Sequence, residues 1–366
     1  MTIADLPLMP LPAGMHARFV DNGNGLRMHL LEAGDPARPC LLLLHGFPEL
    51  AYSWRKVMPV LAAAGFHVVA PDQRGYGRTT GWDSAYDGDV DSFRLLNLVR
   101  DTRGLVSALG HESVAAVVGH DFGASVAAYC ALVHPEMFRS VVLMSAPFGG
   151  PATPDIGAEL AALPRPRKHY QWYYSTRRAN DDMWHCAQGL HAFLRAYFHY
   201  KSGDWAGNRP FQLAHWSAAE LAKMPTYYIM DLDKTMAETV APEMPDAKTI
   251  AACRWLPEDE LAVYSSEYAR TGFQGGLQWY RCRTEGRNKN LAAFAGRSID
   301  VPSAFIAGAS DWGIYQVPGA FEAMQTSACT DMRGCHLVAG AGHWVQQEKP
   351  DEVVRLLREF LAQLKG

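Results

Sequence analysis

Four short apolar runs in the first 145 residues most constrain how this chain can fold. They lie at residues 40–44, 66–71, 114–119 and 140–145. Continuous apolar runs of this length are typical of strands that are buried on both faces of a parallel sheet. Helical stretches lie between them, at about 53–64, at 92–109 and up to 133. Strands that alternate with helices in this way predict a doubly wound, mostly parallel α/β sheet.

The alternation stops after residue 146 and resumes near residue 298. Before it, residues 16–19 and 26–31 flank an Asn-Gly-Asn-Gly turn and predict a β-hairpin. Residues 147–297 are rich in Trp, Tyr, His and Met, with predicted helices at 181–200 and 257–270. Strands follow at 301–309 and 335–338, and an amphipathic helix at 350–364. We therefore expect a core formed by 1–146 and 298–366, with 147–297 as a mainly helical cap over the carboxyl edge of the sheet, where such folds bind ligands.

One strand-to-helix junction has the frame of a nucleophile elbow, Gly-x-nucleophile-x-Gly, at residues 119–123. Glycines suit this turn because it leaves no room for side chains beside the strained central residue. The central residue is Asp121. A carboxylate can displace a leaving group at a saturated carbon and form an ester with itself. The competing interpretation is that Asp121 only caps the helix.

Two residues later in the chain complete a nucleophile–acid–histidine order. Asp311 follows the strand predicted at 303–308, and His343 follows the last predicted strand. This is the chain order of the α/β-hydrolases. His343 would take a proton from water while Asp311 orients its ring. In this fold the backbone N–H groups of Phe47, in the His-Gly-Phe-Pro segment, and of Phe122 would form the oxyanion hole.

Taken together, these motifs resemble the epoxide hydrolase and haloalkane dehalogenase branch of the α/β-hydrolases. The resemblance rests on HGFP at 45–48, DQRGYG at 72–77, GHDFGA at 119–124 and GAGHW at 340–344. It implies hydrolysis of an apolar, small-molecule epoxide to a diol through an ester on Asp121, without a metal or an organic cofactor.

In the cap, two tyrosines match the pair that epoxide hydrolases use to hold and protonate the epoxide oxygen. Tyr170 lies in His-Tyr-Gln-Trp and Tyr280 in Gln-Trp-Tyr-Arg. A neutral phenol of pKa ~10 can donate its proton to the far more basic alkoxide. If the register of the first motif shifts, the alternatives are His169, Tyr173 and Tyr174. The side chains that we expect to contact substrate are His45, Trp172, Trp279 and Trp344.

Two other functions stay open on the same fold. Dehalogenases need N–H donors for the departing halide and usually carry Trp, or in fluoroacetate dehalogenases Arg, after the nucleophile, where this chain has Phe122. Cap tryptophans could replace that donor; they are Trp172, Trp184, Trp205 and Trp279. A non-catalytic ligand sensor is the third reading, although such a protein needs neither the triad nor the tyrosines.

The remaining features mainly exclude functions. The net charge is −4 and no long basic run occurs, which argues against nucleic acid as a partner. The seven cysteines are scattered without CxxC spacing, so we expect no zinc site and a reducing cytoplasm. The N-terminus shows no targeting signal, and we expect no membrane partner. We also expect a monomer or a homodimer.

Residues 201–255 form an unusually long cap segment. We expect it either to shape the substrate entrance or to serve as a dimer contact or as cover for the cap helices. We interpret its two acidic residues at 231 and 233 as surface residues.

Overall fold

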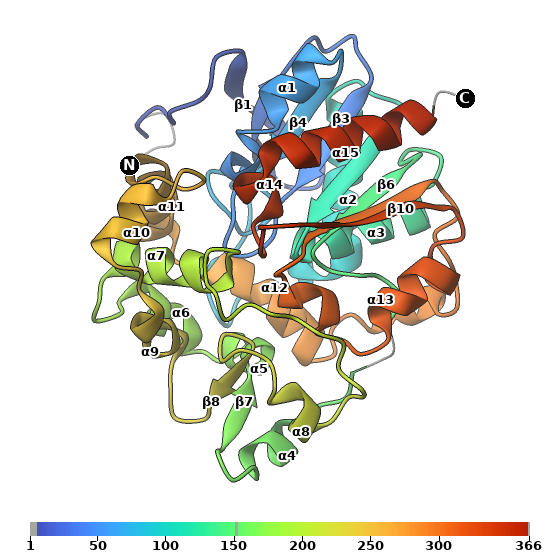
Figure 1. The fold of residues 1–366 in the computed structure, drawn as a ribbon. Coiled ribbons are helices and arrows are strands. Elements are labelled where there is room, and N and C mark those ends of the chain that lie inside the picture. The colour runs from blue at the N-terminus through green and yellow to red at the C-terminus, as the bar shows by residue number, and fades with distance from the viewer. Residues whose placement is uncertain (1–5, 151–152, 365–366) are drawn as a thin grey trace.

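The predicted α/β sheet is present in the computed structural model, which describes residues 6–150 and 153–364. Residues 1–5, where a targeting signal would begin, therefore lie outside the described residues. The sheet has eight strands in the order β1-β2-β4-β3-β5-β6-β9-β10 (Figure 1). Their bounds are β1 Met15–Asp21, β2 Arg27–Ala33, β3 Cys40–Leu44, β4 His67–Pro71, β5 Ala116–His120, β6 Val141–Met144, β9 Ser303–Gly308 and β10 Met332–Val338. The hairpin β1–β2 is antiparallel and β2 pairs antiparallel with β4, while all pairs from β4 to β10 are parallel.

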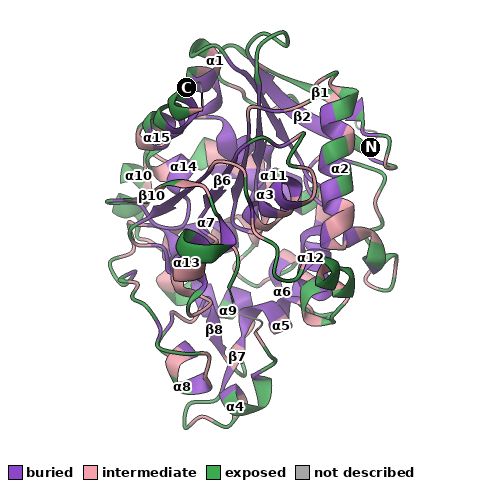
Figure 2. Ribbon diagram, turned by 90° about the vertical axis from the view of Figure 1, so that its right-hand side faces the viewer, coloured by how far each residue is buried: buried purple, intermediate pink, exposed green. Residues whose placement is uncertain are grey.

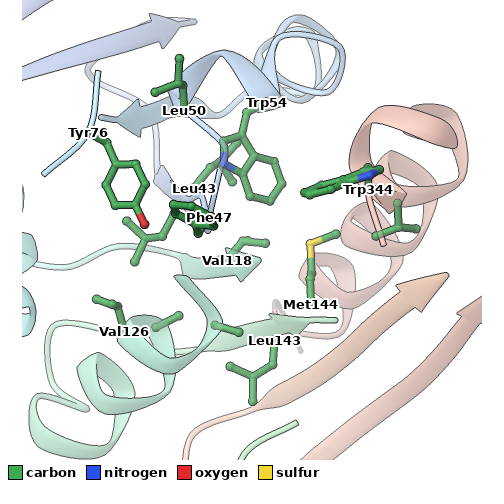
Figure 3. Packing of buried hydrophobic residues seen from close by; sticks show 14 of the residues in the cluster. Leu43, Phe47, Leu50, Trp54, Tyr76, Val118, Val126, Leu143, Met144 and Trp344 are labelled. Carbon is green, nitrogen blue, oxygen red and sulfur yellow. The ribbon is translucent and has the colours of Figure 1, made fainter. Parts of the chain in front are cut away.

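The central strands are buried on both faces, as their continuous apolar sequence predicts. Every residue of β3, β5 and β6 is buried, and Figure 2 shows the buried strands enclosed by helices with exposed outer faces. Figure 3 shows how Leu43, Val118 and Leu143 from these three neighbouring strands pack with other apolar side chains. Because the strands are parallel, their carboxyl ends meet at one edge, where the predicted site residues follow them.

Helices cover the sheet, and one predicted helix is interrupted. The core helices are η2 Ala51–Trp54, α1 Met58–Ala63, η3 Val90–Phe93, α2 Leu95–Ala108, α3 Phe122–Val133, η6 Trp312–Tyr315, α13 Ala320–Ala323, η7 Met324–Ala328, α14 Val345–Glu348 and α15 Pro350–Gln363. The single helix predicted at 53–64 is wrong, since a 3₁₀ turn and α1 replace it. Pro59 in the first turn of α1 explains the break, because proline starts a helix well but cannot continue one.

Between β6 and β9 the chain forms a mainly helical insertion, at the lower left of Figure 1. Its elements are α4 Gly157–Ala161, β7 Arg167–His169, α5 Tyr170–Tyr174, α6 Ala179–Trp184, α7 Leu190–Lys201, α8 Ala218–Leu221, β8 Ile229–Asp231, α9 Met236–Val240, η4 Ala241–Glu243, α10 Ala247–Ala252, α11 Glu258–Thr271, α12 Gln274–Thr284 and η5 Lys289–Phe294. The helix predicted at 181–200 is divided in two at Gly189, which has a φ of 79° that favours glycine. The sequence analysis missed the small antiparallel sheet β7–β8 and helix α12.

None of the helices in the described part of the chain combines the length and the apolar character that a membrane crossing requires.

Candidate active site

The elbow is formed at the junction of β5 and α3, and steric contacts explain its two glycines. Asp121 has φ 53° and ψ −121°, a backbone conformation that residues other than glycine rarely adopt. A Cβ atom on Gly119 would lie 2.2 Å from the carbonyl oxygen of Gly123. A Cβ atom on Gly123 would lie 2.5 Å from the carbonyl oxygen of Leu44. Asp121 is thus presented at the carboxyl edge of the sheet by a turn that only glycine neighbours permit.

Although distant in the sequence, the three residues of the predicted triad come together. His343 Nε2 lies 3.4 Å from Asp121 Oδ2, and His343 Nδ1 donates a hydrogen bond of 3.0 Å to Asp311 Oδ1. The same Asp311 oxygen accepts the N–H of Gly313 at 2.7 Å, which fixes the carboxylate. All three side chains are buried, and His343 Nε2 has no hydrogen-bond partner among the described residues. That nitrogen is therefore free to accept a proton from a water molecule beside Asp121.

Electrostatics favour an ionised nucleophile. Burial by itself would favour the neutral acid, yet the hydrogen bond and electrostatic interaction with His343, followed by the positive charges of Lys201 and His120, hold the pKa of Asp121 well below its ordinary value. Burial likewise opposes ionisation of Asp311, and there too the charge and hydrogen bond of His343 lower the carboxyl pKa. Asp121 is thus a carboxylate at neutral pH, as a nucleophile must be.

The His-Gly-Phe-Pro loop after β3 lies directly against the nucleophile. The backbone N–H of Phe47 donates a hydrogen bond of 3.1 Å to Asp121 Oδ1. Phe122 is the first residue of α3, so its N–H has no partner within the helix. A Cβ atom on Gly46 would lie 2.4 Å from Asp121 Cβ, so glycine is needed there as well. Of the two amides predicted to form an oxyanion hole, that of Phe47 thus contacts the Asp121 carboxylate, and that of Phe122 directly follows Asp121 at the start of α3.

Asp121 opens into a cleft that both predicted tyrosines line. The cleft has an empty volume of about 580 Å³, and its lining includes Asp121, Phe122, Tyr170 and Tyr280. The rings of Tyr170 and Tyr280 are 5.9 Å apart, centroid to centroid. Tyr173 and Tyr174, the alternatives for the first tyrosine, donate their hydroxyl groups to Asp182 and Tyr197 instead. His169, the third alternative, accepts the N–H of Gln171 through its ring at 3.3 Å.

Two glycines that the sequence analysis did not single out bring Tyr280 to the nucleophile. A Cβ atom on Gly275 would lie 2.1 Å from the carbonyl oxygen of Gly75, and one on Gly276 would lie 2.8 Å from the Tyr76 ring. Helix α12 therefore packs closely on the core loop of residues 72–77. One turn later, the Tyr280 ring meets the edge of Phe122 at 5.2 Å. A Gly-Gly pair ahead of a tyrosine was the available sequence signal for this close approach.

Both tyrosines keep their protons at neutral pH. Burial, and secondarily the negative charge of Asp121, raise the pKa of Tyr170 and of Tyr280 well above the ordinary value. The hydroxyl of Tyr170 donates to Gln316 Oε1 at 3.1 Å and accepts from Gln171 Nε2 at 3.1 Å. Two neutral tyrosine hydroxyl groups thus line the same cleft as one ionised carboxylate, an arrangement suited to an oxygen leaving group once Tyr170 turns its O–H from Gln316 to that oxygen.

The comparisons with known proteins agree with this geometry. A family model described as the alpha/beta hydrolase fold matches residues 39–350. Epoxide hydrolase A of Mycobacterium tuberculosis (strain ATCC 25618 / H37Rv) is 34% identical over 358 residues, covering 95% of this chain and 98% of the relative. The chain belongs to the epoxide hydrolases of the α/β-hydrolase fold.

Solved structures of epoxide hydrolases superpose over nearly the whole chain. An epoxide hydrolase from an endophytic Streptomyces has a TM-score of 0.80 and 34% identity, with 97% of each chain covered. Epoxide hydrolase A from Mycobacterium thermoresistibile has a TM-score of 0.77 and 32% identity, with 95% of this chain and 98% of the other covered. The likeness therefore includes the insertion that carries the two tyrosines.

None of the four side chains predicted to contact substrate is among the residues that line this cleft, so their contact with substrate stays a prediction. His45 is fully buried and its ring contacts the carbonyl of Gly46 and the N–H of Gln73. Trp279 and Trp344 donate their indole N–H groups to backbone carbonyls, of Arg74 at 2.9 Å and of Phe198 at 2.8 Å. Trp172 packs edge-on against His169. These aromatic residues support the site of the epoxide hydrolase rather than form its wall.

Other cap tryptophans are equally unsuited to hold a halide. Trp184 donates its indole N–H to the carbonyl of Ala269 at 3.2 Å, and Trp205 donates to Glu243 at 2.8 Å. With Trp279 bound to Arg74, three of the four candidate halide donors are occupied elsewhere, and none of the four lines the cleft. The cleft of this epoxide hydrolase is lined by two tyrosines and by no tryptophan.

Behind the nucleophile lies a buried acid–base pair that sequence reasoning missed. His120 Nδ1 contacts Glu49 Oε2 at 2.5 Å, and His120 Nε2 contacts the backbone carbonyl of His343 at 2.7 Å. Glu49 Oε1 also accepts from the amides of Gln346 and Gln347. The opposite charges raise the pKa of His120 and lower that of Glu49, each against the effect of burial. The pair fixes the backbone of the loop that carries His343.

One cluster of possible metal ligands occurs among the described residues, at the amino edge of the sheet and away from the cleft. Ligand atoms of Cys40, His67 and His111 lie within 4.8 Å of one another. Both ring nitrogens of His67 already have partners, His111 at 2.9 Å and Glu32 at 3.1 Å. Burial raises the pKa of the Cys40 thiol to about 12, which disfavours the thiolate that a metal requires. Hydrogen bonding accounts for this cluster.

The long segment 201–255 lies behind the first tyrosine. It contributes no residue to the lining of the cleft. Its strand β8 pairs with β7, and the carbonyl of Tyr228 accepts the N–H of Tyr170 at 2.9 Å. Asp231, one of the two acids interpreted as surface residues, pairs with Arg165 at 2.7 Å. The segment therefore contacts the backbone of Tyr170 and does not line the cleft, and its effect on the substrate entrance stays a prediction.

Proposed function

We propose that this epoxide hydrolase acts through a covalent ester on Asp121. The observation that carries the proposal is the combination, at one cleft, of an ionised carboxylate on an elbow, a histidine 3.4 Å from it, and two neutral tyrosines. A non-catalytic sensor has no use for this combination. Residues 147–297 act as the cap that delivers the tyrosines, over a core formed by 1–146 and 298–366.

The first step makes the ester. Because Oδ1 of Asp121 is held by the Phe47 amide, Oδ2 is the attacking oxygen. A bond forms between Oδ2 and an epoxide carbon while the carbon–oxygen bond of the ring breaks. The released electron pair takes a proton from Tyr170 or Tyr280, whose hydroxyl groups hold the oxygen from the other side of the cleft. The tyrosine is left as a transient phenolate.

The second step hydrolyses the ester. His343 takes a proton from water, whose oxygen attacks the carboxyl carbon of Asp121, and Asp311 stabilises the charged ring. The amides of Phe47 and Phe122 stabilise the oxyanion on Oδ1. As the oxyanion collapses, the diol leaves with the proton from His343. The proton left on the new carboxyl group restores the tyrosine, so one water is added per epoxide. None of these steps uses a metal or an organic cofactor.

Oxygen labelling tests this proposal. In a single turnover with enzyme in excess in ¹⁸O water, the diol should be almost unlabelled, because its new oxygen comes from Asp121. Label should appear in the peptide that contains Asp121 and pass into product in later turnovers. Label in the first diol with an unlabelled peptide would show that Asp121 only directs water at the epoxide.

A substrate comparison separates the two hydrolase activities. Styrene oxide and 1,2-dibromoethane present a ring oxygen and a halide to the same nucleophile. We expect diol from the first and no bromide from the second, because two tyrosine hydroxyl groups line the cleft beside Asp121 and no indole does. Bromide release at a rate comparable with diol formation would restore the dehalogenase alternative.

A further inference from the structure

Lys201 is a buried cation next to the site that the mechanism above does not use. It is the last residue of α7 and its side chain is 3% exposed. Lysine is almost never buried to this extent unless it is paired. Among the described residues, however, its ammonium group forms no ion pair and no hydrogen bond. A physical reason is needed for a charge in this position.

Aromatic rings surround the Lys201 ammonium. Its Nζ lies 4.9 Å from the ring centroid of Tyr228, 5.4 Å from those of Tyr197 and Trp344, and 5.8 Å from that of Tyr227. Ring faces attract a cation and do not neutralise it. The carboxyl end of α7 adds a further favourable partial charge. The cage thus favours the protonated form of Lys201 without neutralising it, so that its field can act on neighbouring groups.

That field acts on the proposed catalytic residues. After His343, the charge of Lys201 is the next contributor that keeps Asp121 ionised. Conversely, the charges of Asp121, Asp311 and Glu49 raise the pKa of Lys201, although burial lowers it overall. The two sites also touch, because the carbonyl of Lys201 accepts the N–H of His343 at 2.9 Å and Trp344 of the cage follows His343. Figure 3 shows Trp344 beside the core strand that ends at Met144.

We propose that Lys201 is an electrostatic positioning residue that speeds hydrolysis of the Asp121 ester. Asp121 is negative in the resting enzyme and neutral as the ester. Negative charge returns to it in the oxyanion that water creates and in the carboxylate that follows. A fixed positive charge nearby favours that return and gives no such help to ester formation, which removes charge from Asp121. The proposal rests on the covalent route described above.

The test compares the two half-reactions in Lys201→Met, which keeps the length of the side chain and removes its charge. Rapid mixing with styrene oxide, quenching and intact-protein mass spectrometry give the rates of ester formation and ester loss separately. We expect hydrolysis to slow on the order of tenfold, so that ester accumulates, while ester formation is unchanged or faster. Lys168→Met is the matched control, because Lys168 is also a cap lysine over a ring, that of Tyr173 at 4.8 Å, and does not act on Asp121.

Each outcome decides the proposal. Equal slowing of both half-reactions in Lys201→Met would mean that the lysine only maintains the structure of the cap. Unchanged hydrolysis, or the same accumulation of ester in Lys168→Met, would also overturn it. Ester formation reports folding independently, since it uses the same nucleophile and tyrosines. Absence of any ester in the unmodified enzyme would instead contradict the covalent route itself.

Discussion

Gly46 offers a test of how closely the loop after β3 must approach the nucleophile. An ideal Cβ atom on Gly46 would lie 2.4 Å from Asp121 Cβ, 2.5 Å from its Oδ1 and 2.8 Å from its Cγ. Gly46 is not in the left-handed region that strains other residues, so Gly46→Ala changes the space and leaves the backbone angles permissible. The added methyl group therefore acts directly on the position of Asp121.

The expected magnitude follows from these distances. Ordinary contacts between carbon atoms are ~3.5–4.0 Å, so either Asp121 or the loop must move by about 1 Å. Either movement breaks the 3.1 Å hydrogen bond from the Phe47 amide to Oδ1. A misplacement of about 1 Å at a reacting group costs on the order of 100-fold in rate. We expect Gly46→Ala to slow ester formation by roughly this factor.

The assay is single-turnover ester formation by rapid quench, with thermal unfolding measured alongside. Gly157→Ala is the control, because a Cβ atom there would meet only the side chain of Asp155, at 3.2 Å. A rate for Gly46→Ala within about threefold of the parent, at equal thermal stability, would refute the argument that this contact sets the nucleophile's position, since a displaced nucleophile should lose far more.

Four further outcomes are expected. Asp121→Ala should fold normally and produce no diol in steady-state assays, and sustained diol production would exclude it as the nucleophile. His343→Gln should form the ester and fail to hydrolyse it, so intact-protein mass spectrometry should show one substrate mass added. Tyr170→Phe and Tyr280→Phe should each slow ester formation by ~10- to 1,000-fold, which stopped-flow measurements with both single variants would detect. Because the pKa of each tyrosine is raised, both stay protonated as pH increases, and ester formation should not decline up to about pH 9.5; a fall beginning near pH 8 would contradict this.

The sheet and the elbow could be predicted from the sequence, because both are properties of short segments. The buried strands appear as continuous apolar runs, and the elbow requires glycine at 119 and 123 for steric reasons that the structure shows directly. The order of Asp121, Asp311 and His343 after successive strands was sufficient to place them together, since parallel strands end at one edge. Local signals were also sufficient to predict the final helix, found as α15.

Tertiary structure alone decided the walls of the cleft and the charges behind it. Tyr170, and not Tyr173 or Tyr174, faces Asp121, because the pairing of β7 with β8 fixes the start of α5. Trp279 and Trp344, two of the tryptophans predicted to contact substrate, donate to backbone carbonyls of residues far away in the sequence. The cage around Lys201 likewise joins α7, the residues just before β8 and the His343 loop. Such contacts depend on how distant segments pack, which no local pattern of residue types records.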